Sequence, residues 1–196
     1  MTALSAPAPA TLADWAVRRA VLTNALLVVG GAAFTGILAQ VSVPLWPVPI
    51  TGQTLAVLLV GTSLGAARGS LSLAVYALLG MAGVPWFSDQ TGGWGVIVGP
   101  TGGYILGFIA AAALTGWLAE RRWDRRWFGA LVSLSAGTVV VFAFGLPWLA
   151  FSLGLNLEQT LQAGLFPFLI GGAIKAVIAA GLIRGAWTLA DRRASS

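Results

Sequence analysis

The sequence contains no cysteine and no histidine, and only six of its 196 residues are acidic. Without cysteine there are no disulfides or thiolate metal sites, and without histidine there is no Ser-His-Asp triad or histidine-ligated zinc. Charged residues make up 9% of the chain, whereas a soluble domain carries about 25%. So few charges do not cover a water-facing surface of this size, which excludes an ordinary soluble protein.

Apolar sequence is what the chain has in abundance. Hydrophobic residues make up 58% of it, and the mean hydropathy is +0.88. No charged side chain occurs from residue 20 to residue 67, and about 20 apolar helical residues cross a bilayer. We therefore predict one all-α integral membrane domain over residues 1–196, with a flexible cytoplasmic tail over residues 1–17. The six predicted spans cover residues 20–42, 51–67, 69–84, 101–119, 128–153 and 167–188.

The basic residues test this layout independently, because cytoplasmic loops of membrane proteins are rich in lysine and arginine. Six spans place both termini and all ten arginines on one side, and no lysine or arginine in the loops of the other side. Five spans, with Arg68 buried, place the Arg121–Arg126 cluster opposite Arg18 and Arg19. We predict six spans with both termini cytoplasmic, in the bacterial inner membrane. The basic charge then reflects topology, and no nucleic-acid binding is expected.

Small residues recur at four-residue spacing within the predicted spans, a pattern that lets helices approach closely in lipid. Internal bundle packing explains most of these stripes. The first span differs because its small residues cover more than one face. Ala32 and Gly36 are therefore our candidates for contact with a partner subunit.

Lys175 is the one cation outside the predicted cytoplasmic belt. It lies roughly 12 Å below the outer end of the last span, at 1.5 Å rise per residue. A charge at that depth is costly unless it is paired or hydrated, and it marks a functional site by default. Snorkelling to the surface is the alternative, but a lysine side chain is too short to complete it. An ammonium with no acidic neighbour favours an anionic or strongly dipolar ligand.

The outer segment 85–104 is long for a loop in a compact membrane protein, and long loops often serve as lids or binding loops. Its aromatic rings alternate with polar groups, which suits a small ligand that has an apolar body and polar edges. A hairpin with interfacial tryptophan anchors is the structural alternative. The candidate ligand residues are Trp86, Phe87, Asp89, Thr91, Trp94, Thr101 and Tyr104.

A third outer segment, residues 44–54, contains three prolines and leads into the second span. Thr51 is positioned to cap that helix. Gln53 needs partners for both its N–H and its C=O groups if it is buried. A polar ligand meets that need, and so does a hydrogen bond to a neighbouring helix.

The three segments lie on the predicted outer side, so we expect them to form one pocket that binds a solute before its passage. Catalysis is not expected, because the sequence has no plausible paired-carboxylate site in the membrane core and no metal constellation. No nucleotide-binding motif occurs either, and we expect no cofactor. A membrane scaffold or channel without a ligand pocket is the competing interpretation.

At these residues the chain resembles the BioY family, the biotin-specific substrate-binding (S) components of energy-coupling-factor (ECF) transporters. The matching stretches run in family order over residues 44–180. They include Val48-Pro49-Ile50-Thr51-Gly52-Gln53-Thr54, Leu78-Leu79-Gly80-Met81-Ala82-Gly83-Val84-Pro85-Trp86-Phe87-Ser88, Gly99-Pro100-Thr101-Gly102-Gly103-Tyr104, Gly145-Leu146-Pro147-Trp148 and Pro167-Phe168-Leu169-Ile170-Gly171-Gly172-Ala173-Ile174-Lys175.

The resemblance implies a six-helix subunit that binds biotin on its outer side and works with a transmembrane coupling protein and two cytoplasmic ATPases. Some members are thought to act alone, which implies self-association. Small residues on the first helix commonly contact the coupling protein, which fits Ala32 and Gly36. The family usually has an aspartate where this chain has Gly172, so Lys175 lacks its usual acidic neighbour, and Asp89 is a candidate replacement. Another small vitamin is the alternative solute.

On this interpretation the bicycle and chain of biotin pack on Trp86, Phe87 and Trp94. Lys175 engages either the ureido carbonyl or the carboxylate. The remaining polar edges of the ligand bond to Gln53, Thr91 and Tyr104.

Overall fold

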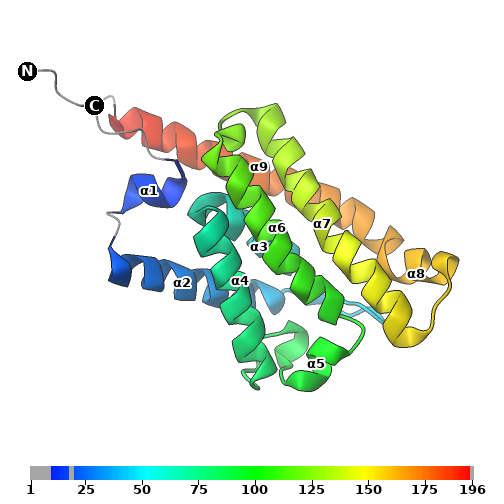
Figure 1. Ribbon diagram of the computed structural model, residues 1–196. Coiled ribbons are helices and arrows are strands. Elements are labelled where there is room, and N and C mark those ends of the chain that lie inside the picture. Colours follow the sequence, from blue (N-terminus) through cyan, green and yellow to red (C-terminus); the bar gives the residue numbers. More distant parts are fainter. Residues whose placement is uncertain (1–9, 18–19, 195–196) are drawn as a thin grey trace, which may run out of the picture.

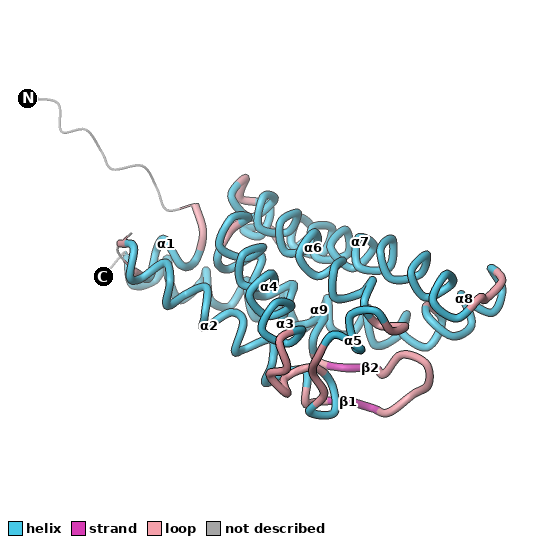
Figure 2. Tube along the Cα trace, turned by 60° about the horizontal axis from the view of Figure 1, so that its bottom comes forward, coloured by secondary structure: helices cyan, strands magenta, loops and turns pink. Residues whose placement is uncertain are grey.

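A computed structural model of the protein describes residues 10–17 and 20–194, which form nine α-helices, two short 3-10 helices and one small hairpin (Figures 1 and 2). The α-helices are α1 (Leu12–Ala16), α2 (Val21–Ala39), α3 (Gln53–Leu64), α4 (Ala66–Met81), α5 (Trp94–Val98), α6 (Gly102–Glu120), α7 (Trp127–Leu153), α8 (Leu157–Gly164) and α9 (Phe166–Ala194). The 3-10 helices are η1 (Ser88–Gln90) and η2 (Trp123–Arg125). The strands β1 (Ser42–Val43) and β2 (Ile50–Thr51) pair antiparallel, Ser42 with Thr51 and Val43 with Ile50.

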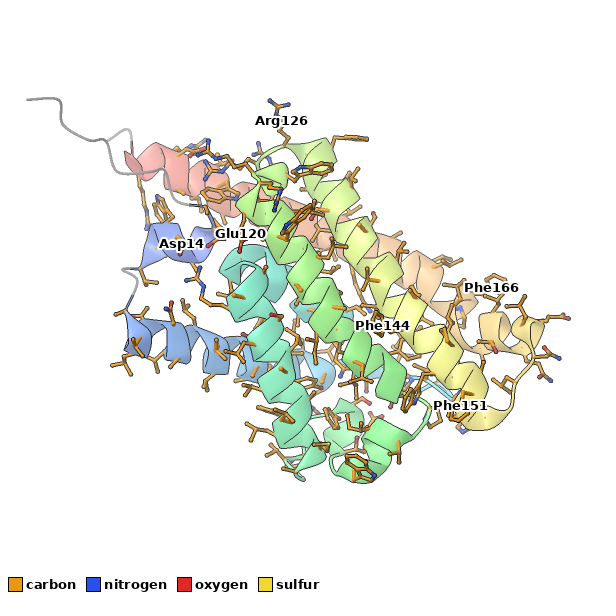
Figure 3. The ribbon with its side chains drawn as sticks, viewed as in Figure 1. Asp14, Glu120, Arg126, Phe144, Phe151 and Phe166 are labelled. Carbon is orange, nitrogen blue, oxygen red and sulfur yellow. The ribbon has the colours of Figure 1, made fainter. Side chains whose placement is uncertain are left out.

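The long helices form a bundle around α3 and α6. Figure 1 shows α6 and α7 running side by side, with α9 behind them and α4 crossing between α2 and α6. Most residues of α3 and α6 are buried, although α6 exposes Leu106 and Trp117, whereas α2, α7 and α9 leave more of their large apolar side chains exposed. Phe144, Phe151 and Phe166 are examples on the outer faces of α7 and α9 (Figure 3). Such all-round apolar helices are typical of a bundle surrounded by lipid.

Helices occupy all six of the segments in which spans are predicted. By length and composition, α2, α6, α7 and α9 are long and apolar enough to cross a membrane. The other two, α3 and α4, are apolar helices of 12 and 16 residues, shorter than the ~20 residues that usually cross a bilayer. Six crossings therefore stay a prediction.

Glycines bring α3, α4 and α6 into backbone contact. A Cβ atom on Gly61 would lie 2.7 Å from the carbonyl oxygen of Ala112 in α6, and one on Gly69 would lie 2.9 Å from the Cα of Gly61. Between α3 and α4 the chain turns at Gly65, whose φ of +88° is readily adopted only by glycine. These positions let three helices approach more closely than side chains would allow.

Arg68 ties α1 to the bundle at the end where α4 begins. Its guanidinium forms an ion pair with Asp14 at 2.9 Å and donates to the carbonyl of Leu64 at 2.8 Å. Figure 3 shows Asp14 and Glu120 near each other at this end. The predicted flexible tail is therefore wrong for residues 12–16, because the ion pair and the Thr11 cap stabilise a helix there. The rest of that prediction, residues 1–9, lies outside the described residues.

The predicted partner contact of Ala32 and Gly36 is also wrong. Ala32 is fully buried, and a Cβ on Gly36 would lie 3.1 Å from Trp86. Both residues face the interior of the bundle because their small size admits α4 and the loop after it. The exposed face of α2 instead carries a different set of small residues, among them Ala25 and Ala33.

A buried carboxylate joins the η2 turn to α9. Asp124 is 1% exposed and accepts a 2.5 Å hydrogen bond from the indole Nε1 of Trp187. The guanidinium of Arg125 stacks over the Trp187 ring at 4.0 Å. Burial raises the pKa of Asp124, and the Trp187 hydrogen bond opposes that shift only in part.

The glycine contacts predict that Gly61→Ala destabilises the protein by about 1–3 kcal/mol, the usual cost of overpacking a core. The matched control is Gly185→Ala, because Gly185 is exposed on α9 with no atom within 4 Å of its Cβ position. Alanine stabilises a helix there by up to about 1 kcal/mol. Thermal unfolding of both variants in detergent measures the difference, and equal midpoints would contradict the proposed close packing.

Because burial raises the pKa of Asp124, we predict that Asp124→Asn increases the stability of the protein to unfolding, and that this increase depends on pH. Asparagine accepts the Trp187 hydrogen bond without a buried charge, so the variant is more stable than the wild type at neutral pH. The gap closes as the pH falls below the folded-state pKa of Asp124, because the wild-type carboxyl is then neutral as well. Unfolding midpoints of both proteins between pH 4 and 7 check this, and a gap that widens toward acid contradicts it.

Candidate functional site

A pocket lies where the β-hairpin, the segment 87–101 and the helices α3, α6, α7 and α9 meet. Polar groups gather at one end, and the remaining wall is apolar. The lining residues are Val48, Pro49, Thr51, Gln53, Thr54, Phe87, Ser88, Val96, Thr101, Tyr104, Ile105, Phe108, Val141, Phe142, Phe168 and Lys175.

Lys175 reaches from α9 to the start of α3. Its ammonium donates to the carbonyl oxygen of Thr51 at 2.6 Å and to the hydroxyl of Thr54 at 3.1 Å. The side chain thus has partners, but both are uncharged. Lys175 thereby joins the last long helix to the chain entering α3, and it presents a cation to the pocket.

Gln53 is held by neighbours on both sides of its amide. Its Oε1 accepts a 2.7 Å hydrogen bond from the Thr51 hydroxyl, and its Nε2 donates to the Tyr76 hydroxyl at 2.7 Å. Of the two roles left open by the sequence, the interhelical bond is the one present. Gln53 lines the pocket, but its strongest interactions are with the protein.

Tyr76 extends this hydrogen-bond chain to the loop after α4. It is fully buried, and its hydroxyl donates to the carbonyl oxygen of Trp86 at 3.3 Å. The indole Nε1 of Trp86 donates in return to the Tyr76 carbonyl at 2.9 Å. The side-chain amide of Gln40 lies within 3.2 Å of the same Trp86 carbonyl and 3.1 Å from that of Phe87. These contacts fix the backbone that carries Phe87 into the pocket.

Phe87 is 1% exposed, and its ring packs directly against Gly80 of α4. A Cβ at Gly80 would overlap that ring, so the glycine makes the space for it. On the opposite wall, the Tyr104 hydroxyl donates to the Gly164 carbonyl at 2.9 Å, and its ring lies 6.5 Å from that of Phe168. Aromatic rings from the 84–93 loop, α6 and α9 therefore line the pocket.

Five of the nine candidate ligand residues line the pocket, namely Lys175, Gln53, Phe87, Thr101 and Tyr104. The other four do not. Trp86 packs on Gly36 behind the pocket wall, and Trp94 is 63% exposed. The Asp89 carboxylate is exposed and accepts a hydrogen bond from Ser42, while the Thr91 hydroxyl donates to the Ser88 carbonyl.

These four candidates all lie within residues 86–94, where the loop turns sharply at Asp89 and Gln90, both with φ of +56°. Sequence reasoning missed Thr54, Ser88 and the apolar wall. Thr54 follows Gln53 by one residue in a segment already singled out, whereas Ile105 and Val141 resemble every other residue of their long apolar helices.

No group of three or more acidic, histidine or cysteine side chains within the described residues is placed to hold a metal ion. The pocket has the chemistry of a binding site for an organic solute: one cation, several hydroxyls and aromatic walls.

Comparisons with known proteins agree on one family. The model of the BioY family matches residues 9–192. The biotin transporter BioY of Thermotoga maritima is 40% identical over 162 residues, covering 83% of this chain and 89% of that protein. The biotin transporter BioY of Rhizobium etli is 37% identical over 156 residues, covering 76% and 83%. A crystal structure of the S-component for biotin from an ECF-type ABC transporter superposes with a TM-score of 0.77 at 26% identity, covering 85% of this chain and 92% of that one.

The Tyr76 hydroxyl joins Gln53 to the Trp86 carbonyl. We therefore predict that Tyr76→Phe makes the backbone of the loop 84–92 more mobile. The variant loses the bond to the Trp86 carbonyl and leaves Gln53 without its acceptor, a loss of about 1 kcal/mol. Hydrogen–deuterium exchange of the 84–92 backbone is then expected to be about five-fold faster.

Tyr104→Phe is the control for this experiment, because its hydroxyl bonds to Gly164 at the other wall of the pocket. Exchange over 84–92 is expected to stay at the wild-type rate in this control. The same exchange rate in both variants contradicts a positioning role for Tyr76.

Proposed function

The chain belongs to the BioY family, and we propose that it binds biotin in the pocket at Lys175 as the substrate-specific subunit of an ECF-type transporter. The family assignment makes it a multi-pass membrane protein with a transport role and no catalytic one. The pocket is the observation that carries the proposal, since it joins one deep cation to hydroxyls and an aromatic wall. A scaffold or channel needs no such enclosed site.

The chemistry of biotin suits these walls. Its bicycle and alkyl chain are apolar, and Phe87, Phe142 and Phe168 offer rings against which they pack. Its ureido group and carboxylate need hydrogen-bond partners at the polar end. Lys175 and Thr54 supply donors there. Gln53 and Tyr104 support the pocket while engaged with protein partners.

We further propose six membrane crossings with both termini cytoplasmic, in the bacterial inner membrane. The arginines support this topology because Arg68, the Arg121–Arg126 cluster and Arg193 lie at helix ends remote from the pocket. The pocket then opens toward the outside. The short α3 fits six crossings because the chain that precedes it already lies inside the bundle. Val48, for example, is buried in the pocket wall.

A transmembrane coupling protein and two cytoplasmic ATPases are the proposed partners, with self-association as the alternative. The sequence contains no nucleotide-binding motif, so we expect the energy for transport to come from these partners. Because Ala32 and Gly36 are buried, we propose that a partner meets the outward face of α2 instead. Ala25, Gly30 and Ala33 keep that face narrow enough for close helix packing.

Another small vitamin is the second candidate solute, and one observation favours testing it. Gly172 stands beside Lys175 where the family usually has an aspartate, so the polar end of this pocket differs from the family pattern. Thermal-shift measurements with a panel of vitamins separate the two: biotin alone stabilises the protein if the proposal holds. Stabilisation by a different vitamin and none by biotin contradicts it.

We predict that Lys175→Met weakens biotin binding ten-fold or more. A hydrogen bond to a charged group contributes about 1.5–3 kcal/mol, and methionine keeps the length of the side chain without its donors. Equilibrium binding of labelled biotin to the detergent-purified chain measures the change. Trp94→Phe is the control, because Trp94 is exposed outside the pocket and should change affinity less than two-fold. Unchanged affinity in Lys175→Met would falsify the assignment.

A further inference from the structure

A second hollow of the bundle is an apolar groove between α1, α2, α3 and α9, and it shares no lining residue with the pocket at Lys175. Of the described residues that line it, only Ser63 is polar, and the others are apolar side chains or glycine. Leu26 of α2 and Leu182 of α9 border it and are exposed. The groove therefore opens on a face of the bundle that contacts lipid.

The groove is about as long as one leaflet of a bilayer is thick. Its wall on α2 reaches from Leu26 to Phe34, which is about 12 Å at 1.5 Å rise per residue. The hydrocarbon core of a bilayer is roughly 30 Å thick, so one leaflet accounts for about 15 Å. A helix that crosses the membrane needs contact over the full thickness, whereas one acyl chain fits within this length.

The groove also lies in one half of the bundle. Its residues on α3 fall between Leu59 and Leu64, in the second half of that helix, and its residues on α9 fall between Leu182 and Ala186. Lys175 and the start of α3 belong to the other half, where the solute pocket lies. An occupant of the groove therefore belongs to a single leaflet.

A polar pocket continues the groove at the end where α2 begins. Leu64 lines both hollows, which makes them adjoin. The other lining residues of the polar pocket include Asp14, Asn24, Arg68 and Glu120, so that charges of both signs meet there. Figure 3 shows Asp14 and Glu120 near each other at this end. An apolar groove with a charged end has the form of a phospholipid site.

Two groups in the polar pocket have hydrogen-bonding capacity that the described residues do not use. Asn24 accepts from Arg68 through Oδ1 at 3.5 Å, and no bond among the described residues uses its two N–H donors. Glu120 accepts from the Ala66 amide through Oε1 at 2.8 Å, and its second oxygen has no donor among those residues. Donors beside the Arg68 cation suit a phosphate, and a carboxylate oxygen suits an ammonium.

We propose that a phospholipid with an ethanolamine headgroup binds here, with one acyl chain in the groove and the headgroup in the polar pocket. The phosphate lies at Asn24 and Arg68, and the ammonium donates to Glu120. With both termini cytoplasmic, the lipid comes from the inner leaflet. A partner on the face of α2 that carries Ala25 and Ala33 lies beside this lipid, because Gly30 borders both surfaces.

Native mass spectrometry of the detergent-purified chain without biotin tests the site. The protein is incubated with equal amounts of phosphatidylethanolamine, phosphatidylcholine and phosphatidylglycerol that carry the same acyl chains. We expect one retained lipid per chain, with phosphatidylethanolamine retained about five-fold more than phosphatidylcholine, whose ammonium has the same charge but no N–H donor. Equal retention of the three, a preference for phosphatidylglycerol, or no retained lipid overturns the proposal.

Gly30→Phe and Gly181→Phe form the matched pair of variants for the acyl chain. No atom lies within 4 Å of the Cβ position of either glycine, so a ring is accommodated at both. Gly30 lines the groove, whereas Gly181 is exposed on α9 and does not line it. Lipid retention is expected to fall ten-fold or more in Gly30→Phe and to stay at the wild-type level in Gly181→Phe. Equal retention in the two variants contradicts an acyl chain in the groove.

Glu120→Gln tests the headgroup separately. Glutamine keeps an acceptor for the Ala66 amide but removes the negative charge, so phosphatidylcholine is retained as in the wild type and the preference for phosphatidylethanolamine disappears. A preference that survives in Glu120→Gln contradicts the headgroup assignment. The same spectra report a competing occupant: a dimer without lipid in the wild type, lost in Gly30→Phe, assigns the groove to a second copy of the chain and overturns the lipid site.

Discussion

The structure depends on a chain of hydrogen bonds that lets polar groups lie deep in an apolar bundle. It runs from the Lys175 ammonium through Thr51 and Gln53 to Tyr76 and the Trp86 carbonyl. A buried polar group without a partner costs several kcal/mol in lipid, so each member holds the next in place. The chain joins α9, α3, α4 and the 84–93 loop, which are the parts that form the pocket.

Close helix packing is the second requirement, and glycine meets it differently at the two ends of the bundle. Between α3, α4 and α6, Gly61 and Gly69 bring backbones together and leave no cavity. Near the pocket, Gly80 makes space for the Phe87 ring, and Gly172 leaves space that no side chain fills. The same residue type therefore builds a rigid core in one place and binding volume in another.

Much of the fold follows from sequence reasoning, and the site follows from it less well. The all-helical membrane class is confirmed, and Lys175 lies in the pocket wall. Five of nine candidate residues line the pocket, and the four that do not all come from the loop segment 86–94. Two left-handed residues, Asp89 and Gln90, redirect that loop, and neither is a glycine that would have signalled the turn.

The sequence by itself determined the membrane class and the singular position of Lys175, because charge is so scarce that each placement has a large energetic consequence. It did not determine which face of a helix looks inward. Lipid is as apolar as a protein core, so hydrophobic pattern does not separate the two faces; Ala32 is buried while Ile37 is 66% exposed. Tertiary structure alone decided that Gln53 bonds to Tyr76, that Trp86 lies behind the pocket, and that Lys175 bonds to neutral oxygens of Thr51 and Thr54.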